Sequence, residues 1–495
     1  MSRIIIQNGN MCELDLPLKF AQKLYNEFAI RHPNAFYLRT RQRGMQNWDG
    51  KIHYITKTGQ FKIGLLPKVY DMCIEMGIKP KVVDMRQPLP KVSKVVTNIG
   101  KYKLRPEQEK AVKAVINNKI GNTPFHIGVL DYTVNAGKTL IMSSLYLSYK
   151  KQLKTLLITN DSDWLNQARE EFKQYLPGED ITFVQGKVLN WSNFTIGMVQ
   201  SISRNMRFYQ KELSQIDMVL VDEADQGGSK QYQNVITRLF NTRIRIGLSG
   251  TIYMSKLAKD KVKNMNLECF FGKVIAEFKL KDSIKKGYST KTVVKMVPGK
   301  PWYGNWESDC ISYKEIYDDS ITNCYTAWLM AYNRLLWNLN QGRYPALVVC
   351  KHIAHCENLY KFFKKKLGDA YNIAYVHVNT PSKLRQQIMK DFREGKIDIL
   401  VSTTIIARGK NFPKLRYLLN TASMDSQEKS IQFLGRLVRT DESKNKVYLD
   451  DLHYPGNYLD RHGKHRKQYY QRQELKVILL DKLWKKHPNH SLIKS

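Results

Sequence analysis

Short runs of apolar, β-forming residues recur along most of this chain, and helical stretches separate them. Runs such as FHIGVLDY, DMVLVDE and RIRIGLSG have the length of one buried strand, and KTLIMSSLYLSYKK has the pattern of a helix. Antiparallel strands can be joined by tight turns, whereas parallel strands need a longer crossover, which is usually a helix. The alternation therefore predicts the α/β class, with parallel sheets that are covered by helices on both faces.

This alternation occurs twice within the 495 residues, so the simplest prediction is two parallel-sheet domains in tandem. A small α+β pattern precedes them, with an IIIQ strand, a helical LPLKFAQKLYNEFAIRH, short strands around WDGKIHYIT and a helical LLPKVYDMCIEMG. The predicted boundaries are 1–85 for a small N-terminal domain, 86–103 for a linker, 104–285 for the first α/β domain, 286–325 for a linker or insert, 326–455 for the second α/β domain and 456–495 for a basic helical C-terminal segment.

Positive charge dominates the composition. The chain has 80 Lys and Arg residues against 44 Asp and Glu, a formal net charge of +36, and the excess is spread along the sequence. Because neutralising phosphates releases condensed counterions, such a charge predicts a polyanionic partner. Nucleic acid is the first expectation and an anionic membrane surface the second.

Cysteine usage and hydropathy indicate the compartment. The seven cysteines are an odd number without a CxxC pair, which argues against a disulfide framework or a zinc ribbon and fits a reducing compartment. The first apolar run is too short for a signal peptide, and no later stretch approaches about 18 uninterrupted apolar residues. We therefore expect a soluble, cytoplasmic protein with no membrane association.

The segment TVNAGKTL, from Thr133 to Leu140, lies between a predicted strand and a predicted helix. In this setting, backbone N–H groups at the start of the helix point toward a phosphate. Lys138 would pair with the β and γ phosphates of ATP, and Thr139 would ligate Mg²⁺. The full GxxxxGK[ST] pattern is incomplete, because Tyr132 occupies the position of the first glycine.

The second segment is the acidic DEAD, which follows the apolar run MVLV. Asp222 ends this predicted strand, where it can hold Mg²⁺, and Glu223 can orient and deprotonate an attacking water. An ordinary surface run of acids is the alternative, and the AGKT upstream argues against it.

The segment QFLGRLVR places polar residues on one predicted helix face. Gln432, Gly435, Arg436 and Arg439 have the spacing i, i+3, i+4 and i+7. Two such arginines could reach a phosphate across a cleft, and an arginine of this kind is worth about 10³ to 10⁵ in phosphoryl-transfer rate. The alternative is an exposed basic helix.

With these segments in order, residues 104 to 452 resemble the superfamily 2 helicases. LRPEQ is similar to the adenine-reading Q element, TVNAGKT to motif I, LITNDSDWLNQ to motif Ia, DEAD to motif II, LSGT to motif III, VVCKH to motif IV, STTIIARGKNF to motif V and QFLGRLVR to motif VI. The resemblance implies two RecA-like domains that use ATP and Mg²⁺. ATP would bind in a cleft between the domains, and alternate closing and opening would move a nucleic-acid strand.

The resemblance also implies roles for single residues. The residues implied in ATP binding are Arg105, Gln108, Asn135, Ala136, Gly137, Lys138, Thr139, Asp222 and Gly409. Those implied in catalysis are Lys138, Asp222, Glu223, Gln432, Arg436 and Arg439, with Thr139 and Asp222 on the metal. Lys351, His352, Thr403 and Arg408 are the candidates for contact with the strand.

Within this superfamily, the chain resembles the bacteriophage UvsW-type helicases most. Shared features are NWDG in a small N-terminal domain, here Asn47 to Gly50, and KHxxH after motif IV, here Lys351 to His355. The resemblance implies an ATP-driven motor that unwinds and remodels branched DNA, such as forks and recombination intermediates, in the host cytoplasm. Two departures are Asp225, where UvsW-type chains have His, and Thr133, where the family pattern has Pro.

Three other functions stay open. A DEAD-box RNA helicase would share motif II, but that family typically has SAT and HRxGRxxR where this chain has Ser249-Gly250-Thr251 and Gln432. A motor subunit of a restriction-type complex would share the ATPase and add protein partners that one chain does not reveal. A non-enzymatic nucleic-acid scaffold would keep the charge and lose the catalytic residues.

The N-terminal domain has its own candidate nucleic-acid surface. Arg39, Arg41 and Arg43 precede Trp48, and such basic and aromatic residues together can meet phosphates and stack on bases. Alternatively, the DG pair that follows Trp48 forms a hairpin turn and the indole packs on its own domain.

Three weaker patterns have two interpretations each. Trp302, Tyr303 and Trp306 could stack on a displaced strand or anchor a linker. The basic segment after Arg461 could contact phosphates or form a solvated helix. The third pattern is the set Cys350, His352, His355 and Cys356, which could bind a metal. We favour the alternative, in which the cysteines belong to the core and the other side chains are polar groups at a cleft.

Overall fold

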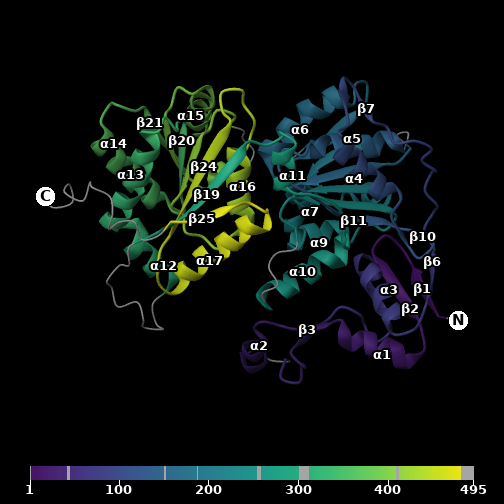
Figure 1. Ribbon diagram of the computed structural model, residues 1–495. Helices are drawn as coiled ribbons and strands as arrows, with labels where there is room; N and C mark the ends of the chain where they lie inside the picture. The colour runs from purple at the N-terminus through teal and green to yellow at the C-terminus, as the bar shows by residue number, and fades with distance from the viewer. Residues whose placement is uncertain are drawn as a thin grey trace. The chain divides into compact units, whose positions relative to one another are not determined.

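The computed structural model describes residues 2–41, 45–149, 152–186, 188–252, 258–299, 312–407 and 412–480. These residues form two compact units, unit 1 (Met1–Phe278) and unit 2 (Lys279–Ser495), each built around a parallel sheet (Figure 1). The small N-terminal domain belongs to unit 1.

The large sheet of unit 1 has the strand order β14-β13-β15-β12-β16-β17-β11-β18. Neighbouring strands are parallel except for β13 and β14. The strands are β11 (His126–Tyr132), β12 (Thr155–Thr159), β13 (Ile181–Gln185), β14 (Val188–Leu189), β15 (Phe194–Met198), β16 (Met218–Asp222), β17 (Ile244–Ser249) and β18 (Val274–Phe278). Every residue of β12, β16 and β17 is buried, as expected for apolar central strands of a parallel sheet.

Helices connect these strands, and the predicted alternation is confirmed. They are α4 (Pro106–Ile116), α5 (Lys138–Ser148), α6 (Ser162–Tyr175), α7 (Val199–Arg204), α8 (Gln210–Ser214), α9 (Lys230–Ile236) and α10 (Ala258–Phe271). Two short hairpins, β7 (Asn98–Ile99) with β8 (Tyr102–Lys103) and β9 (Lys119–Ile120) with β10 (Thr123–Pro124), lie before β11. The first of these hairpins falls within the stretch expected to be a linker.

The N-terminal domain has a four-stranded sheet with the order β5-β2-β1-β6. Its elements are β1 (Arg3–Ile6), β2 (Met11–Asp15), α1 (Leu18–Glu27), β3 (Ala29–Arg31), α2 (Ala35–Arg41), β4 (Lys51–His53), β5 (Gln60–Lys62), α3 (Leu66–Glu75) and β6 (Lys81–Asp84). The predicted first helix ends early, at Glu27, because the next residues form β3 and pair with β4. The alternative of a hairpin turn at Asp49-Gly50 is wrong, since the strand that pairs with β4 ends at Arg31.

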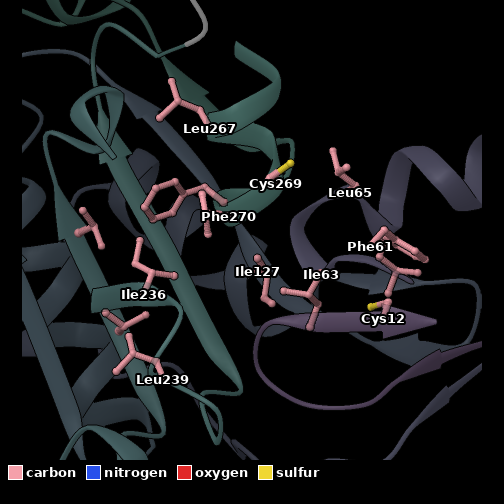
Figure 2. Close-up of a cluster of buried hydrophobic side chains, with 14 of the residues drawn as sticks. Cys12, Phe61, Ile63, Leu65, Ile127, Ile236, Leu239, Leu267, Cys269 and Phe270 are labelled. Atoms are coloured by element: carbon pink, nitrogen blue, oxygen red, sulfur yellow. The ribbon is translucent and has the colours of Figure 1, made fainter. Parts of the chain in front are cut away.

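This domain packs directly on the large sheet of unit 1. Figure 2 shows Cys12, Phe61 and Ile63 of the N-terminal domain in one hydrophobic cluster with Ile127 and side chains of α9 and α10. The buried Arg245 of β17 donates from Nη2 to Gly9 O (2.6 Å) and Asn10 Oδ1 (2.8 Å). The Gly9 backbone lies so close to the 239–242 segment that an added Cβ would be 2.6 Å from Leu239 O. Apolar burial and these hydrogen bonds together fix the domain on the sheet.

The sheet of unit 2 is parallel throughout, with the order β21-β22-β20-β23-β24-β19-β25. Its strands are β19 (Lys291–Pro298), β20 (Ala346–Cys350), β21 (Ile373–Val376), β22 (Ile399–Thr403), β23 (Tyr417–Asn420), β24 (Lys446–His453) and β25 (Val477–Leu479). Its helices are α11 (Leu280–Lys285), α12 (Tyr313–Tyr317), α13 (Tyr325–Leu339), α14 (Ile353–Leu367), α15 (Ser382–Glu394), α16 (Gln427–Leu437) and α17 (Asn457–Arg472). The predicted fold class, two RecA-like parallel-sheet domains in tandem with a small N-terminal domain, is confirmed.

Two stretches differ from the sequence-based expectation. Residues 291–298 lie in the expected linker or insert, yet they form β19, which is paired on both sides by β24 and β25. The C-terminal helix ends at Arg472, and the following VIL forms strand β25 although the segment has helical periodicity. Pairing with β19 decides this conformation, because a three-residue strand has little preference of its own.

The C-terminal helix α17 is an integral part of unit 2. Its buried Arg466 donates from Nε to both carboxylate oxygens of Asp451 (2.9 and 3.0 Å), and Tyr470 donates to the same carboxylate (2.7 Å). One face of the helix is thus fixed to β24, while Arg461, Lys464 and Arg472 are exposed on it. In the described part of the chain, no helix is long and apolar enough to cross a membrane.

Candidate nucleotide-binding site

Four of the sequence motifs lie at the ends of four adjacent strands of unit 1. Strands β12, β16, β17 and β11 are neighbours in this order, and motifs Ia, II, III and I follow them respectively. Because all four strands are parallel, their carboxyl ends meet at one edge of the sheet. Ligands of open α/β sheets bind at this edge.

The motif I loop turns sharply into helix α5. Asn135 and Gly137 have positive φ angles of 65° and 71°, and the helix begins at Lys138. The first turn of a helix leaves its N–H groups without intrahelical acceptors, so the loop presents these donors at the sheet edge. Gly137 suits this position because glycine readily adopts a positive φ. It also leaves room for Gln108, since an added Cβ would lie 2.3 Å from Gln108 Nε2.

Gln108 of the Q element holds this loop in place. Its Nε2 donates to Ala136 O (2.8 Å), and its Oε1 accepts from the Arg105 N–H (2.8 Å). Arg105 also donates from Nη1 to Asn135 O (3.4 Å). The side chain of Gln108 is fully buried. The structure therefore brings Arg105 and Gln108 to motif I, and a contact of either residue with adenine stays a prediction.

Lys138 meets the two acidic residues of motif II. Its Nζ lies 3.4 Å from Asp222 Oδ1 and 3.8 Å from Glu223 Oε1. Asp222 is buried at the end of β16, whereas the Glu223 side chain is partly exposed. Glu223 has a φ of 51°, a conformation that is rare outside glycine and that turns the chain sharply at the end of the strand. Such backbone strain is characteristic of functional sites.

The electrostatics of this group are coupled. Burial alone would lower the pKa of the Lys138 ammonium, but the carboxylates of Asp222 and Glu223 outweigh it and raise that pKa above its usual value. Burial raises the pKa of Asp222, and Lys138 opposes this while Glu223 adds to it. The buried carboxylate thus depends on a nearby cation for its charged form. A lysine in this position can exchange these carboxylates for phosphate oxygens.

Asp225, the last residue of motif II, contacts motif III. Its Oδ1 accepts a hydrogen bond from Ser249 Oγ (2.8 Å), and Ser249 Oγ in turn accepts from the Thr251 N–H (3.1 Å). All three residues are buried. The sequence did not predict this partner, although the adjacency of the two strand ends could have suggested it.

Motif III also lies against motif I. A Cβ added to Gly250 would lie 3.1 Å from Thr133 Cα and 3.2 Å from Tyr132 O, so the two backbones approach closely. Thr133 Oγ1 is buried and has no hydrogen-bond partner among the described residues. A buried hydroxyl of this kind is usually satisfied, so a ligand oxygen at this loop fits the structure. Thr139 and Asp222 add the hydroxyl and carboxylate oxygens that Mg²⁺ prefers.

Unit 2 holds the motif VI residues on and just after helix α16. Gln432 and Arg436 lie on the helix and are partly buried. Arg439 does not share their helix face, because α16 ends at Leu437 and the Arg439 carbonyl accepts from Thr290 Oγ1 (3.1 Å). Thr403 is buried at the carboxyl end of β22. Arg408 and Gly409 of motif V lie outside the described residues, as do Trp302, Tyr303 and Trp306.

Lys351 and His352 follow β20 and surround one buried tyrosine. Lys351 Nζ lies 5.0 Å from the Tyr317 ring centroid, and the His352 ring packs edge-on against that ring at 4.9 Å. His355 is buried, and its Nδ1 lies 3.2 Å from the Tyr317 hydroxyl.

The cysteines next to these histidines are core residues. Cys350 and Cys356 are fully buried, and the Cys356 thiol lies 3.5 Å from Val401 O. Among the described residues, no group of three His, Cys, Asp or Glu side chains could hold a metal ion. Tyr317, which organises both histidines, was not recognised from the sequence.

In the N-terminal domain, the predicted basic surface is exposed. Arg39 and Arg41 lie exposed on α2, and Arg43 is outside the described residues. Trp48 is only partly exposed, and its Nε1 donates to Lys51 O (2.8 Å). Sequence reasoning missed Phe36, which is 80% exposed beside these arginines, although its place in AFYLRTR was visible.

Two family models match the chain. Residues 101–254 match the type III restriction enzyme res subunit family, and residues 329–441 match the helicase conserved C-terminal domain. These ranges contain the motif I to III strand ends of unit 1 and the motif IV to VI elements of unit 2.

Curated relatives are distant. The candidate helicase 22 of Sulfolobus islandicus filamentous virus is 22% identical over 385 residues, which cover 71% of this chain and 64% of that protein. The candidate ATP-dependent helicase IRC3 of Saccharomyces cerevisiae is 23% identical over 377 residues, which cover 70% of this chain and 51% of that protein. The chain thus spans less than two thirds of the length of either relative.

Solved structures share the fold. LlaBIII, an ATP-dependent type ISP restriction-modification enzyme bound to DNA, aligns with 81% of this chain and 34% of its own at a TM-score of 0.57 and 15% identity. S. cerevisiae Dbp5 bound to RNA and ADP BeF3 aligns with 76% of this chain and 90% of its own at 0.51 and 14%. T4 UvsW aligns with 97% of this chain and 98% of its own at 19% identity, but its TM-score of 0.44 establishes no fold by itself.

Both family models cover the segments that carry the helicase motifs, and in unit 1 those motifs converge at one sheet edge. The chain belongs to superfamily 2 of the helicases.

Proposed function

We propose that this protein is an ATP-dependent DNA helicase or translocase that remodels branched DNA. The observation that carries the enzymatic part is the convergence of Lys138, Asp222 and Glu223, with Lys138 Nζ 3.4 Å from Asp222 Oδ1 at the edge of the sheet where β11 and β16 have their carboxyl ends. A cation for phosphates, a carboxylate for Mg²⁺ and a second carboxylate for water are the parts that nucleoside triphosphate hydrolysis needs.

The proposed chemistry assigns one task to each residue. Lys138 leaves the carboxylates and pairs with the β and γ phosphates, while the N–H groups at the start of α5 bind phosphate oxygens. Thr139 and Asp222 would hold Mg²⁺, which neutralises charge that develops on the phosphates. Glu223 orients the attacking water and accepts its proton. Gln108 keeps the motif I loop in position through Ala136.

Gln432, Arg436 and Arg439 are proposed to act on the same nucleotide from unit 2. Their positive charges would stabilise the transition state only when the two units come together, so hydrolysis would alternate closed and open states. This alternation would move a strand bound by residues such as Lys351, His352 and Thr403. Arg39 and Arg41 of α2 are further proposed contacts, with Trp48 the weakest because its indole N–H is already bonded within the domain.

Two features support DNA over RNA. Motif III is Ser249-Gly250-Thr251 and motif VI begins at Gln432, both unlike the usual DEAD-box patterns. The net charge of +36 supports nucleic acid in general and does not distinguish the two. The solved structures that share the fold include a protein bound to DNA and a protein bound to RNA, so the nucleic-acid substrate must be measured.

The deciding experiment measures ATP hydrolysis with forked DNA, single-stranded DNA and RNA of matched length, with Lys138→Ala as the inactive control. The proposal expects forked DNA to stimulate hydrolysis most and Lys138→Ala to abolish it. Stimulation by RNA that equals or exceeds stimulation by forked DNA would overturn the branched-DNA assignment and favour an RNA helicase. No nucleic-acid stimulation at all would leave a motor that needs a further subunit, as in restriction-type complexes.

A further inference from the structure

Three cations surround one exposed indole in unit 2, away from motifs IV and V. Trp337, near the end of α13, keeps 37% of its surface in solvent. Its ring centroid lies 4.9 Å from Lys295 Nζ, 5.0 Å from Arg334 Cζ and 4.8 Å from Arg343 Cζ. Cations over an indole face are individually favourable, but three like charges around one ring also repel one another.

The same surface extends over a second aromatic ring. Arg343 Cζ lies 3.6 Å from the Tyr448 ring centroid, and Lys446 Nζ lies 5.9 Å from it. Lys446 is paired in register with Lys291 across the β19 and β24 strands, and both lysines are exposed. Like charges in adjacent cross-strand positions destabilise a sheet, so this arrangement has a cost that folding alone does not explain.

Acidic residues do not neutralise this surface. The nearby carboxylate is the buried Asp450, which already accepts from Arg334 Nε (3.0 Å), Asn338 Nδ2 (3.1 Å) and the Tyr417 hydroxyl (3.1 Å). Among the described residues, Lys291, Lys295, Arg343 and Lys446 form no ion pair. Burial lowers the pKa of Lys295, Asp450 opposes this, and Arg334, Arg343 and Lys446 lower that pKa further.

The position of this surface separates it from motifs IV and V, which carry the predicted strand contacts of unit 2. Lys291 and Lys446 begin β19 and β24, and Arg343 precedes β20, so the surface lies at the amino-terminal edge of the sheet. Motifs IV and V follow β20 and β22 at the opposite edge. The eight residues of β24 span about 25 Å between the two edges.

We propose that this surface, which we call the Trp337 cluster (Lys291, Lys295, Trp337, Arg343, Lys446 and Tyr448), is a second contact for single-stranded nucleic acid. Phosphates bind the lysines and Arg343, and a base stacks on Trp337. An acidic protein segment would need only the charges, whereas an exposed indole interleaved with cations suits a strand with unpaired bases. The choice of a nucleic-acid occupant rests on the proposed function.

Photocrosslinking tests the location directly. A 20-nucleotide oligo(dT) with 5-iododeoxyuridine substitutions, and an oligo(U) with 5-iodouridine, are crosslinked to the full chain and the adducts are mapped by mass spectrometry. We expect adducts on Trp337 or on Tyr344, which follows Arg343 in the chain and is 43% exposed. The DNA and RNA arms show which strand is preferred.

Affinity measurements test the contribution of each residue. Trp337→Ala should weaken oligonucleotide binding at least fivefold, while Trp337→Phe should retain most of the affinity. Lys291→Ala with Lys446→Ala should lower the slope of log Kd against log salt by about 1.4, because each phosphate contact contributes about 0.7 in single strands. The matched control is Lys361→Ala with Lys365→Ala, two exposed lysines on α14.

Melting curves confirm that each variant is folded, and the salt slope of Lys291→Ala with Lys446→Ala provides the test if Trp337→Ala is not. Unchanged affinity and slope in both the DNA and RNA arms, together with adducts only outside 291–295, 334–346 and 446–448, would overturn the proposal, as would binding of an acidic peptide in place of either oligonucleotide. The two failures are distinguishable: crosslinks on the Trp337 cluster of a parent protein whose ATP hydrolysis no nucleic acid stimulates would count against the proposed function alone, and stimulated hydrolysis without these crosslinks would count against this inference alone.

Discussion

Asp225 Oδ1 accepts a 2.8 Å hydrogen bond from Ser249 Oγ, which joins the end of motif II to the start of motif III within unit 1. Both side chains are buried, and the negative charge of Asp225 also helps to raise the pKa of Lys138, after Asp222 and Glu223. A change in the charge or position of Lys138 can therefore affect Ser249, at the end of β17, through the carboxylate of Asp225. At the position where UvsW-type chains carry His, Asp225 therefore binds the first residue of the SGT segment of motif III.

A double-mutant cycle measures this contact. Ser249→Ala leaves the buried carboxylate short of a donor and should destabilise unit 1 by about 1.5–3 kcal/mol. Asp225→Asn combined with Ser249→Ala should cost less than the sum of the single changes, with a coupling of at least about 1 kcal/mol, as determined by urea unfolding. Additive effects would mean that the two residues do not act as a pair.

Glu223→Gln tests the role of this residue as a base. The amide cannot accept the proton of the attacking water, so kcat for ATP hydrolysis should fall about 10²- to 10⁴-fold. Binding of a fluorescent ATP analogue should stay within about twofold, because Lys138 and the α5 N–H groups are untouched. Glu75→Gln, an exposed change on α3, serves as the control. A variant that loses binding and rate together would show that Glu223 holds the nucleotide.

The sequence predicted the strand-end residues because a parallel sheet leaves little freedom for them. Once TVNAGKT and DEAD each follow a buried strand, Lys138, Asp222 and Glu223 must come near one edge. Side-chain contacts between segments were not predictable in this way. The bond from Gln108 to Ala136 depends on the capping geometry of α4, and the place of Arg439 depends on where α16 ends. Likewise, β25 forms only because β19 offers it an edge.

Gln108→Glu tests how the motif I loop is positioned. The substitution keeps the shape of the side chain but replaces the donor to Ala136 O with an oxygen, so a bond becomes a repulsion. The loop should shift, and affinity for the ATP analogue should fall about tenfold, which corresponds to about 1.4 kcal/mol. Gln210→Glu on α8 makes the same charge change on the surface and should have no effect. Unaltered affinity would show that the loop keeps its position without Gln108.

Acid should destabilise unit 2 through its buried histidines. Burial, with a smaller contribution from His352, lowers the pKa of His355 to about 3, and burial lowers the pKa of His462 to about 4. The unfolded chain binds protons at these positions near pH 6.5 and the folded chain does not. Their contribution to stability is therefore complete above pH 6.5 and is lost as the pH falls, toward about 4 for His462 and toward about 3 for His355.

The variant His355→Gln isolates one of these groups. It should reduce the pH dependence of the unfolding free energy between pH 6.5 and 4.5 by up to about 1.4 kcal/mol per pH unit. His32→Gln, which changes a partly exposed residue of unit 1, should leave the pH dependence of unit 2 unaltered. Equal slopes for His355→Gln and the parent protein would contradict the expectation.

Arg245 should hold the N-terminal domain on the large sheet of unit 1. Burial lowers the pKa of its guanidinium to about 9, with a smaller contribution from Arg86, so the group stays charged at neutral pH and needs its acceptors. Those acceptors are Gly9 O, Asn10 Oδ1 and Phe270 O, and Arg245→Met leaves all of them buried without this donor.

The expected cost of Arg245→Met is about 2–5 kcal/mol in the unfolding of unit 1, measured by urea titration. Arg238→Met, an exposed change close in sequence, should cost under about 0.5 kcal/mol. Limited proteolysis adds a local readout, since release of the 7–10 turn should expose the chain near residues 85–97 to cleavage before the large sheet unfolds. If Arg245→Met and Arg238→Met are equally stable, the hydrophobic cluster of Figure 2 holds the domain without the arginine.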